Sequence, residues 1–392
     1  MNELRASVAL GARTSWILVP LFLTACSLFD VLFAGDSDAD HVVWSVKGHT
    51  NFGRPFVDDS TVYFLGSTHQ VTAVDKRSGR VLWATTLPVD REFTFGTGGV
   101  ALPGRVIVGD QDLFALDPRD GSILWRFVPV PGANAGRGTP TPLGDVVIAG
   151  SSSGNVYAVA WATGTQRWAT RLVPRSRVIV YQPRVADGGV YVSFRDNEVA
   201  PNGEPLGGVA ALDAATGAIR WLKYLPHNVD SAGPTGALDP IITDKLVVVA
   251  ADDGPIYAFD RATGAQVWKA SALLTPGATG PAGIRDTRAL ATTIGMVFSS
   301  SNAKLVMALN GTDGRELWRS PTPLGGGALF LASDARSVFL CQPGAQFEVF
   351  DVSSGKRRWA ITDTPACRGG PAIDGDRLFI GSTNVLFALR ND

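Results

Sequence analysis

The residues that could carry redox, metal or acid–base chemistry are few and scattered along this sequence. Its three cysteines, Cys26, Cys341 and Cys367, form no Cys-x-x-Cys motif. Its four histidines do not pair at metal-ligand spacing: His41, His49, His69 and His227. Asp110, Asp230, Asp252 and Asp286 are isolated carboxylates that we predict to be solvated surface groups. Asp253 is better explained by its place in a turn. The sequence therefore predicts no catalytic residues and no metal site.

The N-terminal segment is typical of an export signal. Arg5 and Arg13 give a weakly positive start, and an apolar run from Trp16 to Ala25 leads directly to Cys26. This run is short for a membrane span. Ordinary secretion with a chance cysteine, and an uncleaved anchor extended by residues 28–34, remain alternatives.

The four residues 23–26 (LTAC) resemble a bacterial lipobox, which implies that Cys26 becomes the diacylated first residue of the mature protein. We therefore expect a lipoprotein signal peptide at 1–25, a lipidated tether at 26–40 and the folded domain at 41–392. Ser27 after the cysteine resembles outer-membrane sorting in enteric bacteria. We expect the protein at the periplasmic face of the outer membrane.

Composition limits the class of protein. A net charge of −1 with no Lys/Arg run argues against nucleic acid as a partner. The 44 glycines and 24 prolines favour many short strands joined by turns. Length alone suggests two or three domains for 392 residues, but an internal repeat overrides that expectation.

One hairpin pattern recurs seven times, with Gly four residues before Trp in every copy. The copies occupy residues 71–83, 113–125, 156–168, 209–221, 256–268, 306–318 and 347–359. Their glycines are Gly79, Gly121, Gly164, Gly217, Gly264, Gly314 and Gly355. Successive tryptophans lie about 40 to 50 residues apart, which is the spacing of propeller blades.

Each position that recurs among the seven hairpin copies has a physical explanation. Aspartate at the first turn position can accept backbone hydrogen bonds in an Asx-turn. Asn310 can do the same, whereas Ala160 cannot, so the third turn is expected to be looser. Glycine supplies the positive φ that closes the hairpin. A tryptophan on the outer strand can fill the wedge between blades.

The eighth copy is split between the two ends of the chain. Residues 384–389 match the strand before the turn, and residues 41–46 supply the outer strand. Eight tryptophans then occupy one structural position: Trp44, Trp83, Trp125, Trp168, Trp221, Trp268, Trp318 and Trp359. A second hairpin upstream of each copy gives four strands per blade. The sequence predicts an all-β, eight-bladed β-propeller closed by pairing the N-terminal strand with the C-terminal blade.

The D-x-x-[ST]-G-x-x-x-W pattern resembles the quinoprotein-like (pyrroloquinoline-quinone-type) propeller family over nearly all of residues 41–392. One branch contains quinone-dependent dehydrogenases. The other contains BamB-type lipoproteins, non-catalytic subunits of the bacterial outer-membrane β-barrel assembly machine. The lipobox, the bare eight-blade design and the chain length resemble the second branch. The adjacent cysteines that accompany the quinone are absent, so we expect neither an enzyme nor a cofactor.

The resemblance also implies a docking segment. Arg137, Gly138 and Pro140 match the arginine, glycine and proline of the BamB-type loop that docks the barrel-assembly subunit. Ala135 and Gly136 stand where leucines are expected. Residues 178–183 (VIVYQP) replace the acidic residues that the family places before a proline.

Strand order places the long inserts on one face, which we predict to be the partner face. These inserts are 172–183, 194–208, 225–239 and 271–285, although tolerated surface insertions are an alternative. Cys341 and Cys367 are expected on that face in adjacent blades. An oxidising periplasm would allow a disulfide between them, with two free thiols as the alternative.

The functional hypothesis is a non-catalytic periplasmic scaffold that binds a protein of the cell envelope, namely a BamB-like subunit. The alternatives are a propeller lipoprotein with another envelope partner, a relative of the quinone-dependent dehydrogenases, and a sensor or sugar-binding propeller.

Overall fold

The computed structural model describes residues 39–47, 53–66, 68–89, 98–129, 138–174, 178–196, 207–226, 239–251, 255–271, 287–293, 295–301, 305–322, 330–342, 346–362, 369–382 and 385–392. They belong to one compact unit, Gly35–Asp392. Within these ranges the only helix is the short 3-10 turn η1 (Ala39–His41), and no helix there is long and apolar enough to cross a membrane. The predicted signal peptide, with Cys26, lies outside the described residues.

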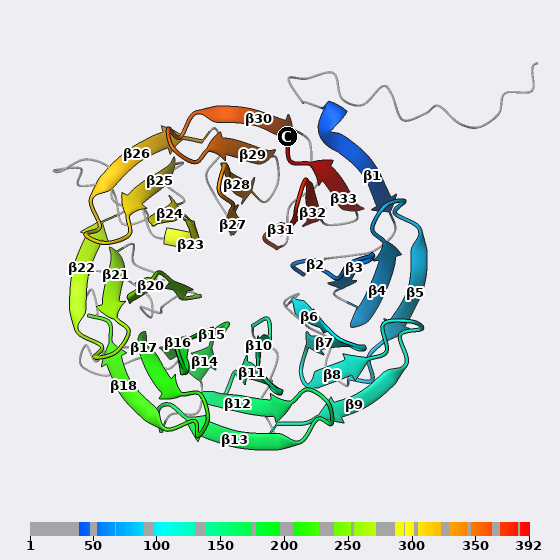
Figure 1. Cartoon of the computed structure of the whole chain (residues 1–392), viewed down its shortest axis with the longest axis horizontal. Coiled ribbons are helices and arrows are strands. Elements are labelled where there is room, and N and C mark those ends of the chain that lie inside the picture. The colour runs from blue at the N-terminus through cyan, green and yellow to red at the C-terminus, as the bar shows by residue number, and fades with distance from the viewer. Residues whose placement is uncertain are drawn as a thin grey trace, which may run out of the picture. The chain divides into compact units, whose positions relative to one another are not determined.

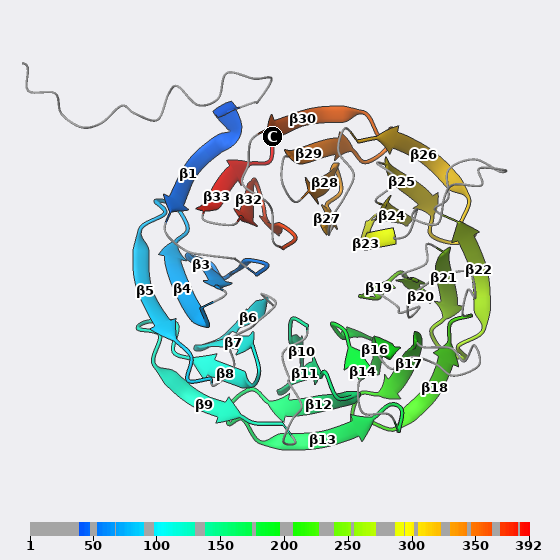
Figure 2. The ribbon, with the colours of Figure 1, turned by 180° about the vertical axis from the view of Figure 1, so that it is seen from behind.

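Eight antiparallel sheets form a ring around one axis, as the sequence predicts (Figures 1 and 2). Blade 1 contains β2 (Phe56–Val57), β3 (Thr61–Leu65), β4 (Gln70–Asp75) and β5 (Val81–Thr86). Blade 2 contains β6 (Gly99–Leu102), β7 (Arg105–Gly109), β8 (Leu113–Leu116) and β9 (Ile123–Phe127). Blade 3 contains β10 (Thr141–Leu143), β11 (Val146–Gly150), β12 (Asn155–Ala160) and β13 (Gln166–Arg171). Blade 4 contains β14 (Val178–Val180), β15 (Arg184–Ala186), β16 (Gly189–Asp196), β17 (Gly207–Asp213) and β18 (Ile219–Tyr224).

The second half of the ring repeats the same order from the innermost to the outermost strand. Blade 5 contains β19 (Ile241–Ile242), β20 (Leu246–Ala250), β21 (Pro255–Asp260) and β22 (Gln266–Ser271). Blade 6 contains β23 (Thr287–Thr293), β24 (Met296–Ser301), β25 (Leu305–Asn310) and β26 (Glu316–Pro321). Blade 7 contains β27 (Phe330–Ser333), β28 (Ser337–Gln342), β29 (Gln346–Asp351) and β30 (Arg357–Thr362). Blade 8 contains β31 (Ala372–Asp374), β32 (Arg377–Gly381), β33 (Val385–Arg390) and β1 (Val42–Lys47).

The two ends of the chain close the ring. β1 pairs antiparallel with β33, so that Trp44 lies opposite Ala388, and this confirms the predicted split blade. The Trp44 indole N–H donates to the Lys76 carbonyl (3.1 Å), and the Lys76 ammonium group lies 2.7 Å from the Asp374 carboxylate. Blades 8 and 1 are therefore joined by side chains as well as by their packed cores.

Blade 4 departs from the predicted four strands. β14 pairs with β16, with Val178 opposite Asp196 and Val180 opposite Phe194, which makes a five-stranded sheet. Val178 and Val180 are fully buried in the core between blades 3 and 4. The sequence interpretation placed these residues in a surface insert. Their burial stabilises an additional strand instead.

Each repeat glycine packs against the tryptophan of the preceding blade. The seven glycines have φ between +68° and +74°. An ideal Cβ on Gly264 would lie 2.7 Å from the Trp221 ring, and one on Gly79 would lie 2.9 Å from the Trp44 ring. Glycine is thus required twice at this position, for the left-handed turn and for the ring that lies against it.

The eighth tryptophan has no following glycine turn and is covered differently. Seven indole N–H groups donate to a carbonyl in the next blade's turn, as Trp83 does to Pro118 (2.9 Å). The Trp359 indole N–H is buried without such a partner. Instead, the His41 imidazole stacks on the Trp359 ring, with centroids 4.1 Å apart and planes inclined by 12°.

The predicted Asx-turns are present, but the expectation for Ala160 was wrong. Asp213 Oδ1 accepts from the amides of Ala215 (3.1 Å) and Thr216 (3.0 Å). At Ala160 the amides of Gly164 and the carbonyl of Thr165 make the same backbone bonds as elsewhere, each 2.8 Å. The backbone ladder and Gly164 therefore hold this turn without a side-chain cap.

Candidate functional site at the loop face

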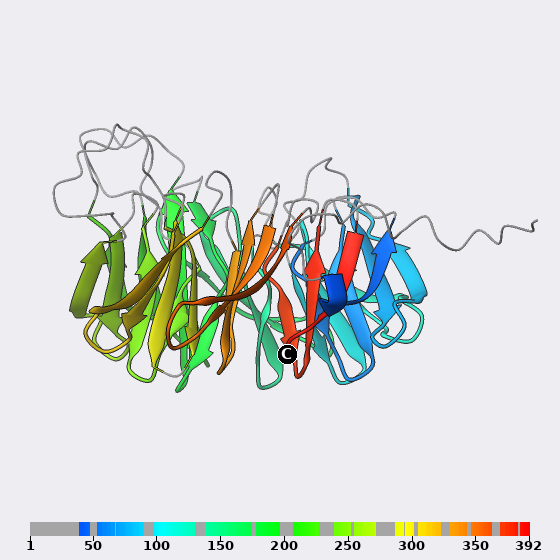
Figure 3. The same ribbon diagram turned by 90° about the horizontal axis from the view of Figure 1, so that it is seen from above.

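The ring has two unlike faces. The turns that join first to second and third to fourth strands lie on one side, visible as the short coloured turns of Figure 3. We call this side the turn face. The opposite side, where the innermost strands begin, is the loop face. The strands that flank the predicted inserts end and begin at the loop face, which agrees with the expected placement.

The innermost strands begin at equivalent positions around the axis. The six residues that pair with equivalent positions of the second strand in their blades are Phe56, Val100, Thr141, Arg184, Ile241 and Ala372. The residues two positions before them are therefore also equivalent from blade to blade. The aligned residues are Arg54, Gly98, Thr139, Gln182, Asp239 and Gly370. Together with their neighbours they form what we call the axial belt, a layer of first-strand starts at the loop face.

Close backbone contacts hold the axial belt together. An ideal Cβ on Gly369 would lie 2.6 Å from the Arg54 amide nitrogen, and one on Gly98 would lie 2.6 Å from Thr139 Oγ1. An ideal Cβ on Gly138 would lie 2.7 Å from the Gln182 amide nitrogen. Gly138, predicted as a partner-binding residue, therefore has a packing role. Any side chain there would displace the start of blade 4.

The predicted docking residues lie in this belt as far as the structure describes them. Gly138 and Pro140 are both part of it, and the Thr141 hydroxyl just after them donates to the Pro183 carbonyl (2.7 Å). Arg137 lies outside the described residues. The structure thus links the 138–140 segment to the segment of blade 4 that the resemblance also singled out.

Three charged residues of the axial belt influence one another electrostatically, and the sequence interpretation missed them. We call Arg54, Arg184 and Asp239 the axial cluster. Burial lowers the pKa of the Arg54 guanidinium, the positive charge of Arg184 lowers it further, and Asp239 raises it. Burial also lowers the pKa of Arg184, and Asp239 again acts in the opposite direction. Both groups stay protonated near neutrality, because arginine has a very high intrinsic pKa.

Two members of the axial cluster are hydrogen-bonded to neighbouring backbone groups. Arg184 Nε donates to the Pro240 carbonyl (2.9 Å), and Asp239 Oδ1 accepts from the Gln182 amide (3.0 Å). In the register of the ring, Arg184 occupies a position at which the other described innermost strands carry Phe56, Val100, Thr141, Ile241, Ala291, Ala332 and Ala372. A charged residue at this otherwise apolar or small position calls for a specific reason.

A histidine–aspartate pair links blades 1 and 2 near the same face. His69 Nδ1 lies 2.6 Å from Asp110 Oδ2, and the Asp110 side chain is fully buried. Burial raises the pKa of Asp110, and the His69 contact lowers it. The prediction that Asp110 is a solvated surface group was therefore wrong. His69 itself has φ +59°, a left-handed conformation that is unfavourable for a residue other than glycine.

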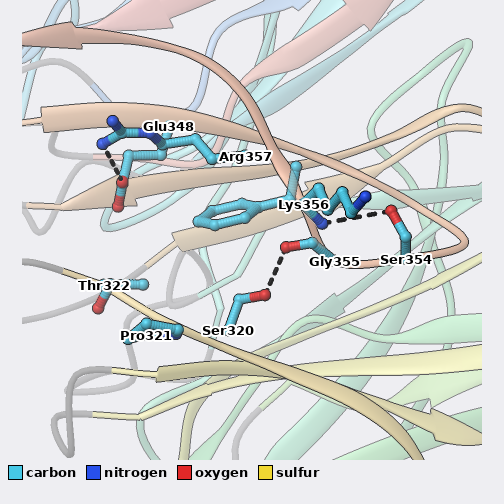
Figure 4. Close-up of a pocket in the computed structure, with 9 residues that line it drawn as sticks. Ser320, Pro321, Thr322, Glu348, Ser354, Gly355, Lys356 and Arg357 are labelled. Atoms are coloured by element: carbon cyan, nitrogen blue, oxygen red, sulfur yellow. Dashed lines mark hydrogen bonds and ion pairs between the residues drawn. The ribbon is translucent and has the colours of Figure 1, made fainter.

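A pocket between blades 6 and 7 is explained by the repeat. Its volume is about 520 Å³, and Ser320, Glu348 and Arg357 line it (Figure 4). The Ser320 hydroxyl donates to the Gly355 carbonyl, as Thr85 and Thr170 do to the equivalent glycines of other blades. The buried Glu348 carboxylate lies 3.6 Å from the exposed Arg357 guanidinium.

A serine-rich turn and a buried cysteine lie elsewhere in the ring. Residues 150–154 (GSSSG) fit the Gly-x-Ser-x-Gly pattern of hydrolases, but they join β11 to β12 in a hairpin rather than a strand to a helix. Cys341 is fully buried in β28 and is disulfide-bonded. Cys367 lies outside the described residues, so its pairing with Cys341 stays a prediction. No described residues gather as a set of three or more metal ligands.

The eight-bladed ring, its Gly-to-Trp repeat and its split closing blade define a quinoprotein-like β-propeller. A family model described as "Outer membrane protein assembly factor BamB" matches residues 30–202 and 188–391. The chain therefore belongs to the BamB family of outer-membrane protein assembly factors.

Curated relatives of the same name agree with this assignment at modest identity. The factor from Burkholderia pseudomallei is 27% identical over 238 residues, 58% of each chain, and that from Yersinia pestis is 26% identical over 58% of this chain and 60% of its own. The aligned part thus spans about three fifths of these relatives. A quinone-dependent alcohol dehydrogenase subunit from Gluconobacter oxydans is 28% identical, over 33% of this chain and 19% of its own.

Solved structures share the fold. BamB from Moraxella catarrhalis superposes with a TM-score of 0.69 at 17% identity, over 89% of this chain and 99% of its own. Quinohemoprotein alcohol dehydrogenase from Comamonas testosteroni gives the same TM-score at 15% identity, over 89% of this chain and 76% of its own. Identities this low compare architecture, not activity.

Proposed function

We propose that this chain is a non-catalytic binding scaffold of the bacterial cell envelope that assists the assembly of outer-membrane β-barrel proteins. It is held by lipid on Cys26 at the periplasmic face of the outer membrane. The observation that carries the proposal is the family match, which extends from residue 30 to residue 391 and includes the whole ring. A rigid ring with its longer connections on one face suits the binding of other proteins.

The docking surface is the part of the axial belt around residues 138–140. Gly138 keeps the described segment 138–140 against the start of blade 4, and Arg137 directly precedes that segment in the sequence. The acidic residues that the BamB resemblance places before blade 4 are replaced here by β14. Because Val178 and Val180 are buried, their side chains are not available to a partner. Docking therefore depends on Arg137 and the segment 138–140 that follows it.

A dehydrogenase-like role has less support. The dehydrogenase relative aligns over only 19% of its own length. Its branch implies adjacent cysteines beside a quinone, whereas no two of Cys26, Cys341 and Cys367 are adjacent in this sequence. Cys341 is disulfide-bonded. The cysteines of this chain do not fit that part of a quinone site.

Affinity purification of the tagged, lipidated full chain from its native membranes tests the proposal, with bound proteins identified by mass spectrometry. We expect the barrel-assembly subunit to be recovered with the wild-type chain. Arg137→Glu should reduce its recovery by reversing the charge at the docking segment. Arg167→Glu is the matched control, because Arg167 is an exposed residue of the same blade on its outer strand.

Reproducible absence of the barrel-assembly subunit, with another envelope protein enriched, would refute the assembly role and leave the fold assignment intact. Equal recovery with Arg137→Glu and wild type would refute the docking mode alone. A Cys26→Ser chain that still sediments with membranes after export would refute the lipid anchor.

A further inference from the structure

We propose that an apolar stripe on the outer rim of blades 8, 1 and 2 rests on the phospholipid surface that holds the lipid anchor. The inference deepens the proposed function, since it rests on the anchoring of Cys26 and states which part of the ring meets the membrane. The stripe consists of the two residues before the repeat tryptophan in these three blades: Val42 and Val43, Val81 and Leu82, and Ile123 and Leu124.

A β-bulge exposes neighbouring residues of the outermost strands. In blade 1 the register shifts between Ala73 and Val74, so that Leu82 has no partner in β4. Blades 2 and 8 have the same shift. Successive side chains of a regular strand point to opposite faces, and a bulge breaks this alternation. Val81 and Leu82 are consequently both exposed to solvent.

The other five blades have at least one polar residue in the equivalent pair. Those pairs are Gln166 and Arg167, Ile219 and Arg220, Gln266 and Val267, Glu316 and Leu317, and Arg357 and Arg358. The three wholly apolar pairs are therefore consecutive, on β1, β5 and β9, which follow one another along the outside of the ring (Figures 1 and 2). Exposed apolar groups that gather in one area indicate a binding surface, whereas scattered ones do not.

Packing between blades joins the three pairs into one stripe. Trp44 of blade 8 lies against Gly79 of blade 1, and Trp83 of blade 1 lies against Gly121 of blade 2. Each of these tryptophans directly follows the apolar pair of its own blade, and each of these glycines precedes the apolar pair of its own blade by two residues. The stripe therefore continues across both blade boundaries.

The described chain begins at the same edge of the ring. The apolar pairs of β5 and β9 follow the turns that join third to fourth strands, so they lie near the turn face. β1 starts at this edge as well, because Val42 pairs with Leu389 near the end of β33. Ala39 follows Cys26 by 13 positions (26 to 39) in the sequence. A chain of that length spans at most about 43–47 Å, so a lipid on Cys26 keeps this edge within that distance of the membrane.

The charged residues around the stripe suit a phospholipid surface. Arg77 and Arg80 are exposed beside the middle pair, and Arg167 and Arg358 are exposed beyond the two ends. Asp120 is an opposing charge in the turn of blade 2, where it accepts a hydrogen bond within that turn. Basic groups beside an apolar surface attract lipid phosphates, while the apolar side chains enter the headgroup region. This contact leaves the loop face available to a protein partner.

Hydroxyl-radical footprinting of the purified, lipidated full chain in vesicles of phosphatidylethanolamine and phosphatidylglycerol tests the contact. Mass spectrometry gives the oxidation rate of each side chain, which is divided by its rate in the unfolded chain. Val267 is the matched control, because it occupies the position of Leu82 in blade 5, across the ring (Figure 1). Its exposure is 50%, against 40% for Leu82 and 45% for Leu124. Oxidation of both leucines should fall about 3-fold or more below that of Val267, since the bilayer removes them from water.

Leu124→Asp provides a second measurement on the same stripe. The substitution lies at an exposed position, so the fold should be retained, and circular dichroism checks this. A charge in place of an apolar side chain disfavours the membrane contact, so the ratio of covered to open Leu82 should fall about 10-fold. Val267→Asp should leave Leu82 covered.

Equal normalised oxidation of Leu82, Leu124 and Val267 in vesicles would overturn the proposal, and so would unchanged coverage of Leu82 in Leu124→Asp. Coverage that grows with the protein-to-lipid ratio would assign the stripe to a second copy of the chain, which also overturns it. If the three side chains are equally oxidised while affinity purification still recovers the barrel-assembly subunit, the membrane contact fails and the assembly role stands. A chain that does not float with the vesicles would overturn the lipid anchor, and the contact with it.

Discussion

The contact between each repeat glycine and the preceding tryptophan makes a quantitative prediction about stability. Gly264 has φ +69°, and an ideal Cβ there would lie 2.7 to 2.9 Å from three atoms of Trp221. Gly104 has nearly the same φ, +70°, but nothing lies within 4 Å of its ideal Cβ. Alanine at Gly104 pays only the left-handed backbone cost of about 1–2 kcal/mol. Alanine at Gly264 must also displace the indole by roughly 1 Å from an ordinary 3.5–4.0 Å contact.

Overpacking of this kind adds about 1–3 kcal/mol, so Gly264→Ala should lose that much more stability than Gly104→Ala. The measurement is guanidinium unfolding followed by far-UV circular dichroism, with equal slopes required before the midpoints are compared. In a Trp221→Leu chain, the difference between the two glycines should largely disappear. Equal losses for the two alanine variants, or a difference that survives Trp221→Leu, would show that the tryptophan contact does not constrain the glycine.

Three further predictions concern the turns, the closing blade and the cysteines. Hydrogen bonds lower the pKa of Asp213 and Asp351 to about 2. The stability that these two carboxylates contribute is therefore present above the ordinary pKa of 3.8 and is lost as the pH falls towards 2. Asp351→Asn should show a smaller acid-induced drop in thermal midpoint than wild type. His41→Ala removes the stack on Trp359 and should cost about 0.5–1.5 kcal/mol in denaturant unfolding, whereas His41→Phe should retain most of it. Alkylation of the unfolded, unreduced chain should leave Cys341 and Cys367 unmodified, and a label on both would contradict their pairing.

The repeat made most of the fold predictable from sequence. Glycine and tryptophan at a fixed spacing gave the blade count, and residues 41–46 and 384–389 gave the closing pair. β14 was not predictable, because three apolar residues within an insert do not distinguish a strand from a buried loop. Asp110 was misjudged because its partner, His69, is 41 residues away in the neighbouring blade.

The candidate site was predictable only in part. Gly138 and Pro140 could be found because they form a local motif. The axial cluster could not, since Arg54, Arg184 and Asp239 come from three blades and share no motif. Their equivalent places follow from strand register, which aligns the starts of the innermost strands of different blades. The unusual feature that could have indicated it is Arg184 at a position where other blades carry apolar or small residues.

The pairing of β1 with β33 sets the order in which the ring can be completed. A chain made and exported from its N-terminus presents β1 about 340 residues before its partner exists, counting from Lys47 to Val385. Throughout that interval β1 lacks the strand that hydrogen-bonds to it in the finished ring. Any factor that shields β1 during export would therefore act on yield rather than on the stability of the finished ring.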